Sequence, residues 1–269
     1  MPTLAIDDRV VSYEEYGAGP LVVLVHGSPG NGKAWSRVGE RLADRHRIIA
    51  PDLPGHGGTT PQAAGEVPDV ADTATLIEAL LGRVGAPALL AGYSYGGVVA
   101  LAIALRARVS IGALALLEPV AVSALNLTGD PDLHARTRAV FDGYIAGVEG
   151  GDPLQVRTMV EFWFGPGAFE HMPESLRAYL VREAATNVRD VRGALREDYS
   201  PAGLRRLSMP VTTLVGGCSP EITRTIARTI TAHVPRGTLA IVDGATHALI
   251  TTHAEAVAEA LAALVPGAA

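Results

Sequence analysis

Short apolar runs alternate with longer amphipathic stretches along most of the chain. The apolar runs are largely continuous, which is typical of strands that are buried on both faces of a sheet. They occupy residues 21–25, 47–50, 87–91, 111–117, 211–215 and 238–242, and residues 9–15 add an alternating run. Amphipathic or alanine-rich stretches predict helices at about 33–44, 69–84, 96–108, 219–233 and 249–265. This alternation predicts a mostly parallel sheet that is covered by helices on both faces.

The alternation is interrupted once, by residues 120–204, which contain no convincing strand pattern. Amphipathic patterns predict helices there near 131–149, 153–163, 173–186 and 188–198, with breaks rich in glycine and proline between them. We therefore predict an α/β core made of residues 1–119 and 205–269, with a helical cap inserted at 120–204. The length of 269 residues is compatible with one domain and an insertion, or with two small domains.

Composition and charge narrow the function classes. Hydrophobic residues make up 48% of the chain and charged residues 19%, which indicates a folded protein with a sizeable core. The formal net charge of −6 is spread along the chain, so we expect neither nucleic acid nor a membrane surface as a partner. No apolar run reaches the roughly 18 residues of a membrane span, and the N-terminus lacks the apolar segment of a secretory signal. Because Cys218 is the one cysteine, no internal disulfide can form, and we expect a cytoplasmic protein.

Three chemically active side chains follow predicted strands. Ser94 lies in the turn after residues 87–91, Glu118 comes directly after 111–117, and His247 follows 238–242. Because the carboxyl ends of parallel strands meet at one edge of the sheet, we expect these three side chains to lie close together. A serine hydroxyl becomes a strong nucleophile only when a base removes its proton during attack, so a nearby histidine would give the serine a chemical role.

Several glycine-containing motifs stand in a fixed order along the chain. They are His26-Gly27 before a glycine- and proline-containing loop, Asp52-x-x-Gly55-x-Gly57, Gly92-Tyr93-Ser94-Tyr95-Gly96 and Gly244-x-x-His247. Together they resemble the α/β-hydrolase superfamily, in which G-x-S-x-G is the nucleophile elbow. The resemblance covers the whole chain. It implies a mostly parallel eight-stranded sheet with helices on both faces, and residues 120–204 would be the variable helical cap.

The resemblance also implies roles for individual residues. Ser94 would be the nucleophile and His247 the general base of a catalytic triad. The backbone N–H groups of Ser28 and Tyr95 would form the oxyanion hole, which stabilises the negative charge of the intermediate.

Other polar residues have simpler interpretations. His253 competes with His247 for the role of base, but its position suits a helix face or a helix cap. His26 and His56 are expected to shape loops by hydrogen bonding. Cys218 does not stand in a nucleophile-elbow motif and is expected to pack as a small apolar residue. No phosphate loop, metal-ligand cluster or dinucleotide fingerprint occurs, so we expect no cofactor and no metal.

The acid of the triad is where the chain departs from the commonest pattern of the superfamily. The usual aspartate follows the strand that is here 211–215, and Ser219 stands at its place. A serine cannot stabilise a positively charged imidazole as a carboxylate does. Glu118 is the favoured acid, because a carboxylate directly after an apolar strand is costly unless something pairs with it. Glu221, in the first turn of the next helix, and Asp243 remain alternatives, as does a site without a triad acid.

We predict a serine hydrolase that cleaves a small, mostly apolar ester or lactone through an acyl-enzyme on Ser94. Tyr93, Trp163 and Phe164 would line the substrate pocket, although aromatic clusters in small helical caps often belong to the core. Two alternatives stay open. The serine at 219 suggests a ligand-binding, receptor-like protein with weak turnover, and the same site would also suit a lyase or a C–C bond hydrolase. The expected partner is a small-molecule substrate, and a homo-oligomer is compatible with these features.

Overall fold

An eight-stranded sheet forms the centre of the part of the chain that the computed structural model describes, residues 1–61 and 69–266. The strands are β1 (Thr3–Ile6), β2 (Arg9–Tyr16), β3 (Leu21–Val25), β4 (Arg47–Pro51), β5 (Leu89–Tyr93), β6 (Ala113–Leu117), β7 (Val211–Gly216) and β8 (Gly237–Val242). They lie side by side in the order β1-β2-β4-β3-β5-β6-β7-β8. β2 pairs antiparallel with β1 and β4, and the remaining neighbours are parallel. The predicted, mostly parallel sheet is confirmed.

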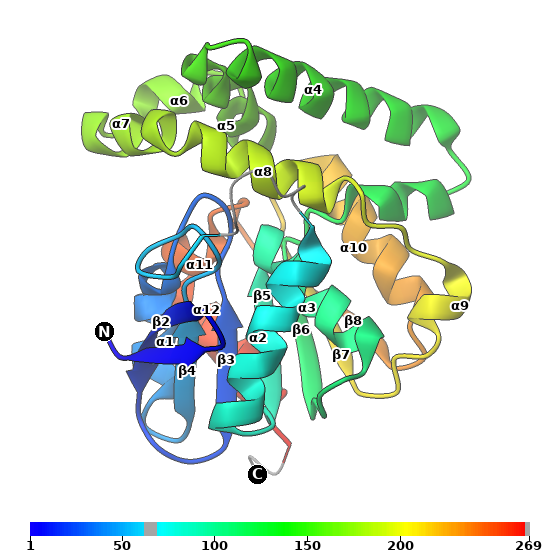
Figure 1. Cartoon of the computed structure of the whole chain (residues 1–269). Coiled ribbons are helices and arrows are strands. Elements are labelled where there is room, and N and C mark those ends of the chain that lie inside the picture. The colour runs from blue at the N-terminus through cyan, green and yellow to red at the C-terminus, as the bar shows by residue number, and fades with distance from the viewer. Residues whose placement is uncertain (62–68, 267–269) are drawn as a thin grey trace.

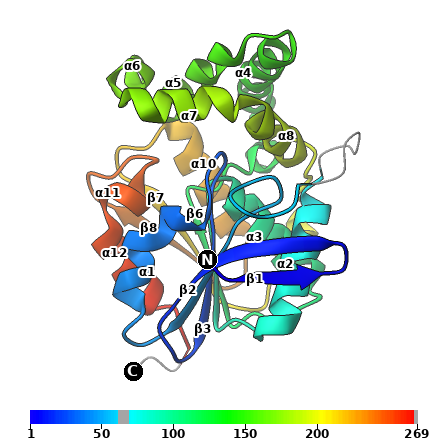
Figure 2. The same ribbon diagram turned by 60° about the vertical axis from the view of Figure 1, so that its left-hand side comes forward.

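Helices cover both faces of this sheet (Figures 1 and 2). Val22 and Leu24 of β3 belong to an apolar cluster with α1 (Ser36–Leu42), which follows the short turn η1 (Gly32–Trp35), and with α12 (Ala254–Ala262). Val23 and Val25 belong to the cluster on the opposite face, with α2 (Val70–Val84), α3 (Tyr95–Arg106) and α10 (Glu221–His233). Successive side chains of a strand point to opposite faces, so the continuous apolar run of β3 is buried on both sides.

A layer of helices lies over the carboxyl-terminal edge of the parallel strands (Figure 2). Its members are α4 (Pro131–Glu149), α5 (Val156–Phe164), α6 (Ala168–His171), α7 (Glu174–Arg182) and α8 (Ala184–Ala194), with the short turns η2 (Val122–Leu127) and η3 (Pro153–Gln155). The short α9 (Pro201–Leu204) leads from this layer to β7. The division into a core of 1–119 and 205–269 and a cap of 120–204 stays a prediction, and residues 62–68 and 267–269 of that core lie outside the described residues.

The edges of the sheet depart from the apolar pattern. β1 was not predicted, because only Ile6 of its residues is buried and backbone pairing with β2 holds the strand in place. β8 was expected to be buried on both faces, but it forms the other edge, and Ile241 is 56% exposed there. Edge strands bury less side-chain surface than central strands, so apolar runs describe them poorly.

Two predicted helices have different ends. The stretch 249–265 contains α11 (Leu249–Thr252) and α12, separated at His253, whose φ of −128° and ψ of 40° are not helical. The helix predicted at 173–186 ends at Arg182, and α8 already begins at Ala184. Within the described residues, none of the helices combines the length and the hydropathy that a membrane crossing requires.

Candidate active site

Ser94 occupies a sharp turn between β5 and α3. Its φ of 55° and ψ of −118° are rare for a residue with a side chain and cost on the order of 1 kcal/mol or more. A Cβ on Gly92 would lie 2.1 Å from the Gly96 oxygen, and a Cβ on Gly96 would lie 2.3 Å from the Val25 oxygen. The glycines on both sides of Ser94 are therefore needed for the chain to reverse here. The turn holds Ser94 directly before the first turn of α3.

Hydrogen bonds connect Ser94, His247 and Glu118 in series. The Nε2 atom of His247 lies 3.2 Å from the Ser94 Oγ atom, and its Nδ1 atom lies 3.0 Å from Glu118 Oε2. All three are buried, with exposed fractions of 7% for Ser94, 3% for His247 and 0% for Glu118. An ionised carboxylate only accepts, so Nδ1–H donates to Glu118 and Nε2 is left to accept the Ser94 proton. The structure thus brings the three predicted residues together, from the ends of β5, β6 and β8.

The Glu118 carboxylate is held by three donors. Besides His247, the Gly216 N–H and the Ser219 hydroxyl both donate to its Oε1 atom, each at 2.6 Å. A buried carboxylate is costly unless its oxygens accept hydrogen bonds, and charge-assisted bonds of this kind are strong. Ser219, at the position where the superfamily usually has an aspartate, therefore supports the glutamate of the neighbouring strand.

The competing residues lie elsewhere. Glu221 is exposed at the start of α10, where hydrogen bonds from Arg228 and then the nearby charges of Arg228 and Arg224 lower its pKa. Asp243 is also exposed. His253 stands at the N-terminal end of α12, and its Nδ1 atom lies 2.9 Å from the Thr252 hydroxyl.

Three aromatic side chains enclose the imidazole ring of His247. The indole of Trp163, from α5, stacks on it with 4.9 Å between ring centroids and 15° between planes. Phe164 meets the imidazole edge-on at 5.6 Å, and the Tyr93 ring lies at 5.4 Å. The Tyr93 hydroxyl donates to the His247 carbonyl oxygen at 2.7 Å, and burial together with the charge of Glu118 raises the pKa of Tyr93, which keeps it a neutral donor. These residues fix the orientation of His247.

Three further aromatic side chains near the site have packing roles. Trp35 is fully buried and meets the Tyr93 ring edge-on. Phe162 packs edge-on against Trp163, and Phe169 is buried in the apolar cluster that also contains Trp163.

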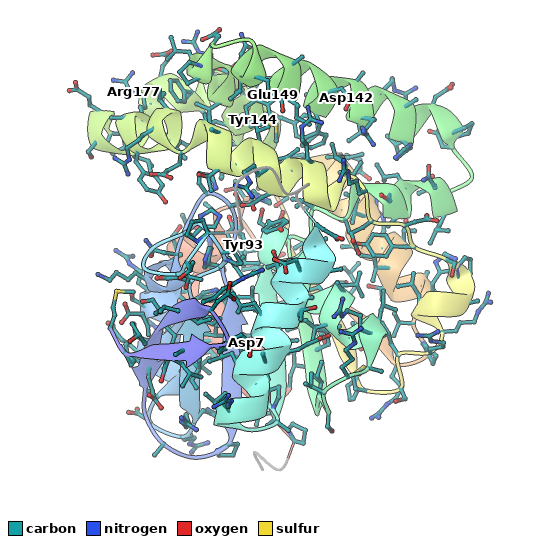
Figure 3. All side chains as sticks on the ribbon, viewed as in Figure 1. Asp7, Tyr93, Asp142, Tyr144, Glu149 and Arg177 are labelled. Atoms are coloured by element: carbon teal, nitrogen blue, oxygen red, sulfur yellow. The ribbon has the colours of Figure 1, made fainter. Side chains whose placement is uncertain are left out.

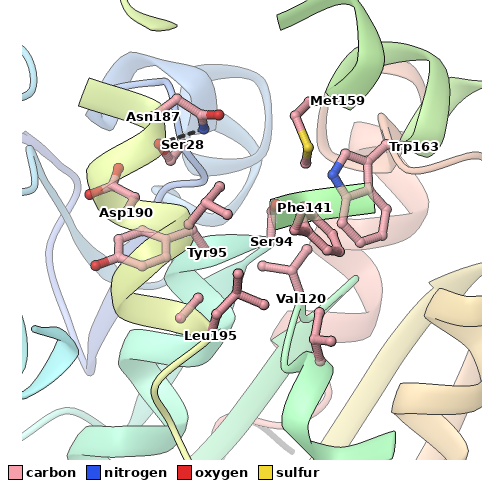
Figure 4. Close-up of a pocket in the computed structure, with 13 residues that line it drawn as sticks. Ser28, Ser94, Tyr95, Val120, Phe141, Met159, Trp163, Asn187, Asp190 and Leu195 are labelled. Carbon is pink, nitrogen blue, oxygen red and sulfur yellow. Dashed lines mark hydrogen bonds between the residues drawn. The ribbon is translucent and has the colours of Figure 1, made fainter. Parts of the chain in front are cut away.

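Ser28 and Tyr95 both lie close to Ser94, with Ser28 above Tyr95 in the view of Figure 4. The N–H of Tyr95 belongs to the first turn of α3, where N–H groups lack acceptors within the helix. Ser28 follows β3, and its Oγ atom accepts a hydrogen bond from Asn187 Nδ2 of α8 at 3.0 Å. Both predicted oxyanion residues therefore border the space next to the Ser94 hydroxyl.

His26 and His56 have different partners. The Leu53 N–H donates to His26 Nε2 at 2.9 Å, and His26 Nδ1 lies 2.7 Å from the Gly27 carbonyl oxygen. Burial first, and the nearby His56 second, lower the pKa of His26 to about 3, so this histidine is a neutral loop-shaping residue. His56 Nε2 lies 2.8 Å from Asp190 of α8. Burial lowers the pKa of His56, but the hydrogen bond and the charge of Asp190 outweigh burial and raise it.

Two cavities meet at Ser94. The smaller has a cavity volume of about 40 Å³ and extends between Tyr95, Val120, Phe141 and Leu195 (Figure 4). The larger has a cavity volume of about 440 Å³ and is lined mainly by apolar side chains of α5, α7 and the segment after β8. The residues that line both cavities are Ser28, Ser94, Met159, Trp163 and Asn187.

Comparison with known proteins now assigns the family. A model of the alpha/beta hydrolase family matches residues 22–260, which is most of the chain. The chain belongs to the alpha/beta hydrolase family. The predicted superfamily, fold class and hydrolase-type enzyme are thereby confirmed.

The relatives of this hydrolase include esterases. It is 31% identical over 262 residues to the pimeloyl-(acyl-carrier protein) methyl ester esterase of Methylococcus capsulatus, a match that covers 90% of this chain and 93% of that protein. A thermophilic esterase from Thermogutta terrifontis has a similar structure, with 26% identity, a TM-score of 0.74 and coverage of 99% and 97% of the two chains. The esterase EaEST from Exiguobacterium antarcticum shares the fold, with a TM-score of 0.77 at 20% identity over 97% of each chain.

The site of this hydrolase also holds features that the sequence did not indicate. Asn187 and Asp190 both project from α8 toward the core, but polar residues on an amphipathic helix usually face water and gave no signal. Cys218 was expected to pack as an apolar residue and is instead exposed, because it lies in the turn after β7. In the described part of the chain, no group of three or more metal-binding side chains gathers in one place.

Proposed function

We propose that this hydrolase is a carboxylic ester hydrolase that acts through an acyl-enzyme on Ser94. The observation that carries the proposal is the hydrogen-bonded series from Ser94 through His247 to Glu118, where two cavities meet. The names of relatives, among them a methyl ester esterase and a thermophilic esterase, agree with this chemistry.

The first half of the proposed reaction forms the acyl-enzyme. The Ser94 oxygen attacks the ester carbonyl carbon while its proton moves to His247 Nε2, and Glu118 stabilises the resulting imidazolium. The N–H groups of Ser28 and Tyr95 hold the oxyanion, at about 3 kcal/mol of transition-state stabilisation per donor. The C–O bond to the alcohol then breaks, and His247 gives its proton to the departing alkoxide.

The second half frees the enzyme. Water attacks the acyl carbon and passes one proton to His247, and the new tetrahedral intermediate again places its negative oxygen between the two N–H groups. When the bond to Ser94 breaks, His247 returns the proton to the serine oxygen. The products are a carboxylic acid and an alcohol, and the serine is restored.

The cavity walls support a small, mostly apolar ester or lactone as the substrate. Val120, Phe141 and Leu195 line the smaller cavity, and Val160 and Phe164 are among the apolar residues of the larger one. Burial of apolar substrate groups against such walls contributes about 25 cal/mol for each Å² removed from water. In the proposed complex the acyl and alcohol parts occupy the two cavities on either side of Ser94.

The reason for considering a receptor-like protein no longer applies. It depended on the serine at position 219, which would leave the histidine without an acid. Glu118 lies within hydrogen-bond distance of His247, and Ser219 donates to that carboxylate. Hydrolysis is therefore the better-supported function.

The test compares the wild type with Ser94→Ala on p-nitrophenyl esters of short and medium acyl chains. Loss of the nucleophile should reduce kcat by roughly 10⁶-fold and should abolish covalent labelling by a fluorophosphonate. Ser175→Ala, on the exposed surface of α7, is the matched control and should behave as the wild type. A wild type without esterase activity, or undiminished labelling of Ser94→Ala, would refute the proposal.

A further inference from the structure

Two buried polar side chains connect the helical layer with half-buried Ser28 in the loop after β3. The Tyr144 hydroxyl, on α4, donates to Asn187 Oδ1 at 2.8 Å, and Asn187 Nδ2, on α8, donates to Ser28 Oγ at 3.0 Å. Tyr144 lies among the upper helices, and Asn187 points down at Ser28 (Figures 3 and 4). The exposed fraction is 1% for Tyr144 and 5% for Asn187.

The distances define the direction of these hydrogen bonds. Burial, and then the charge of Asp190, raise the pKa of Tyr144, so its phenol keeps its proton. That proton has a good acceptor in Asn187 Oδ1 at 2.8 Å and a poor one in the Ala184 carbonyl oxygen at 3.5 Å. The amide oxygen of Asn187 is thus turned to Tyr144, and its N–H groups are turned to Ser28.

Because Asn187 donates to Ser28, the Ser28 hydroxyl acts as an acceptor in this hydrogen bond. A hydroxyl that accepts a hydrogen bond keeps its own hydrogen available for a second partner. Ser28 and Asn187 both line the two cavities at the point where these meet beside Ser94. The hydrogen of the Ser28 hydroxyl is therefore free to point at a substrate oxygen next to the attacked carbonyl.

We propose that Asn187 is a positioning residue, which turns the Ser28 hydroxyl into a substrate donor beside the oxyanion hole. The inference rests on the proposed ester hydrolysis. Asn187 itself acts through Ser28, and Tyr144 fixes the Asn187 amide. The helical layer would thereby add a substrate donor next to the oxyanion site of the core loop.

Asn187→Asp is the decisive variant, because a carboxylate of the same shape only accepts hydrogen bonds. The Ser28 hydroxyl then donates to the carboxylate and turns away from the substrate. The expected result is a loss of about 100-fold in kcat with little change in KM, since the donor acts on charge that develops in the transition state. Protonation of the new carboxyl restores a donor, so the ratio of variant to wild-type kcat should rise as the pH falls.

A double-mutant cycle separates positioning from a general loss of packing or an added charge. Ser28→Ala removes the hydroxyl but keeps the backbone N–H, and in that background Asn187→Asp should have no further effect on kcat. Asn126→Asp, at an exposed position of η2, controls for the added negative charge and should leave kcat unchanged. If Asn187→Asp does not fold, Tyr144→Phe takes its place and should lower kcat several-fold, again only when Ser28 is present.

The outcomes of this experiment are distinct. The inference is supported if Asn187→Asp lowers kcat only when Ser28 is present, and if kcat relative to the wild type recovers at low pH. Equal losses in both backgrounds, or no loss in an active enzyme, overturn it and leave ester hydrolysis intact. A wild type that cleaves no ester overturns the proposed function and this inference with it.

Discussion

Glu118 is a fully buried carboxylate whose two oxygens accept hydrogen bonds from His247, Ser219 and the Gly216 N–H. Its position was predictable, because an acidic residue directly after the apolar run Ala113–Leu117 needs a buried partner. The role of Ser219 was not predictable. Whether its short side chain reaches Glu118 depends on how the ends of β6 and β7 are spaced, and this spacing is a tertiary property.

The unequal roles of these residues give the first prediction at the residue scale. Glu118→Gln should lower kcat by about 10⁴-fold, because an amide neither holds the required histidine tautomer nor stabilises the imidazolium. Ser219→Ala should keep activity within about tenfold of the wild type, but should reduce the free energy of unfolding by about 1.5–3 kcal/mol through loss of one charge-assisted hydrogen bond. Ester kinetics and urea unfolding measure both effects.

Glu221→Gln is the matched control for Glu118→Gln, because Glu221 is exposed and paired with arginines on its own helix. It should leave kcat unchanged. An equal loss of kcat in Ser219→Ala and Glu118→Gln would contradict the supporting role of Ser219.

His26 gives a second prediction, on acid stability. Its pKa is lowered to about 3 in the folded chain, mainly by burial, whereas an ordinary histidine titrates near 6.5. Between these pH values the unfolded chain binds a proton that the folded chain does not, so folding stability is lost as the pH falls below about 6.5. The unfolding free energy of both proteins should fall between about pH 7 and pH 5. This fall should be about 2 kcal/mol smaller for His26→Gln than for the wild type.

The measurement is urea unfolding of the two proteins at both pH values. His171→Gln, at an exposed position of α6, is the control and should follow the wild type. The same loss in His26→Gln as in the wild type would show that other groups cause the acid sensitivity.

At the scale of elements, the amphipathic pattern predicted most of the helices within 120–204 but not how they attach to the core. Asn187 and Asp190 are three positions apart and therefore share one face of α8. Their partners are Ser28 and His56, which lie in loops more than a hundred residues earlier in the sequence. A single sequence contains the period of a helix, but the docking of that helix depends on the complete set of packed neighbours.

The pair of His56 and Asp190 predicts pH-dependent attachment of α8. Burial opposes the charge of His56, but Asp190, and to a smaller extent Glu183 and Asp52, raise its pKa, while the neighbouring His26 stays neutral. A raised pKa means that the contribution to stability is fully present below the ordinary value of 6.5 and is lost as the pH rises through the folded value. Asp190→Asn should thus lower the unfolding free energy by about 1.5–3 kcal/mol at about pH 6, and by much less at about pH 9.

Thermal and urea unfolding at the two pH values check this expectation. Asp142→Asn, on the exposed surface of α4, is the control for loss of a carboxylate. Equal losses at both pH values for Asp190→Asn would mean that the ion pair does not depend on the charge of His56.

At the scale of the whole molecule, the net charge and the composition of the cavity walls both disfavour negatively charged substrates. The chain carries a formal net charge of −6, and the residues that line the two cavities include Asp190 but neither lysine nor arginine. A negative field slows the approach of anions, and an apolar site without a cation offers no compensation for the desolvation of a carboxylate. Net charge and composition were readable from the sequence, whereas the membership of the cavity walls required the fold.

This combination predicts selection against negatively charged esters. Methyl octanoate and the monomethyl ester of octanedioic acid have acyl chains of the same length, and in the second a carboxylate replaces the terminal methyl group. We expect kcat/KM to be at least about tenfold lower for the charged ester, because its carboxylate loses hydration without gaining a partner. Raising the salt from about 0.05 M to about 0.5 M shortens the screening length severalfold. The difference in kcat/KM between the two esters should then narrow, because the long-range repulsion of the charged ester is screened. A charged ester that is cleaved as fast as the neutral one would require a cationic contact that neither cavity wall supplies.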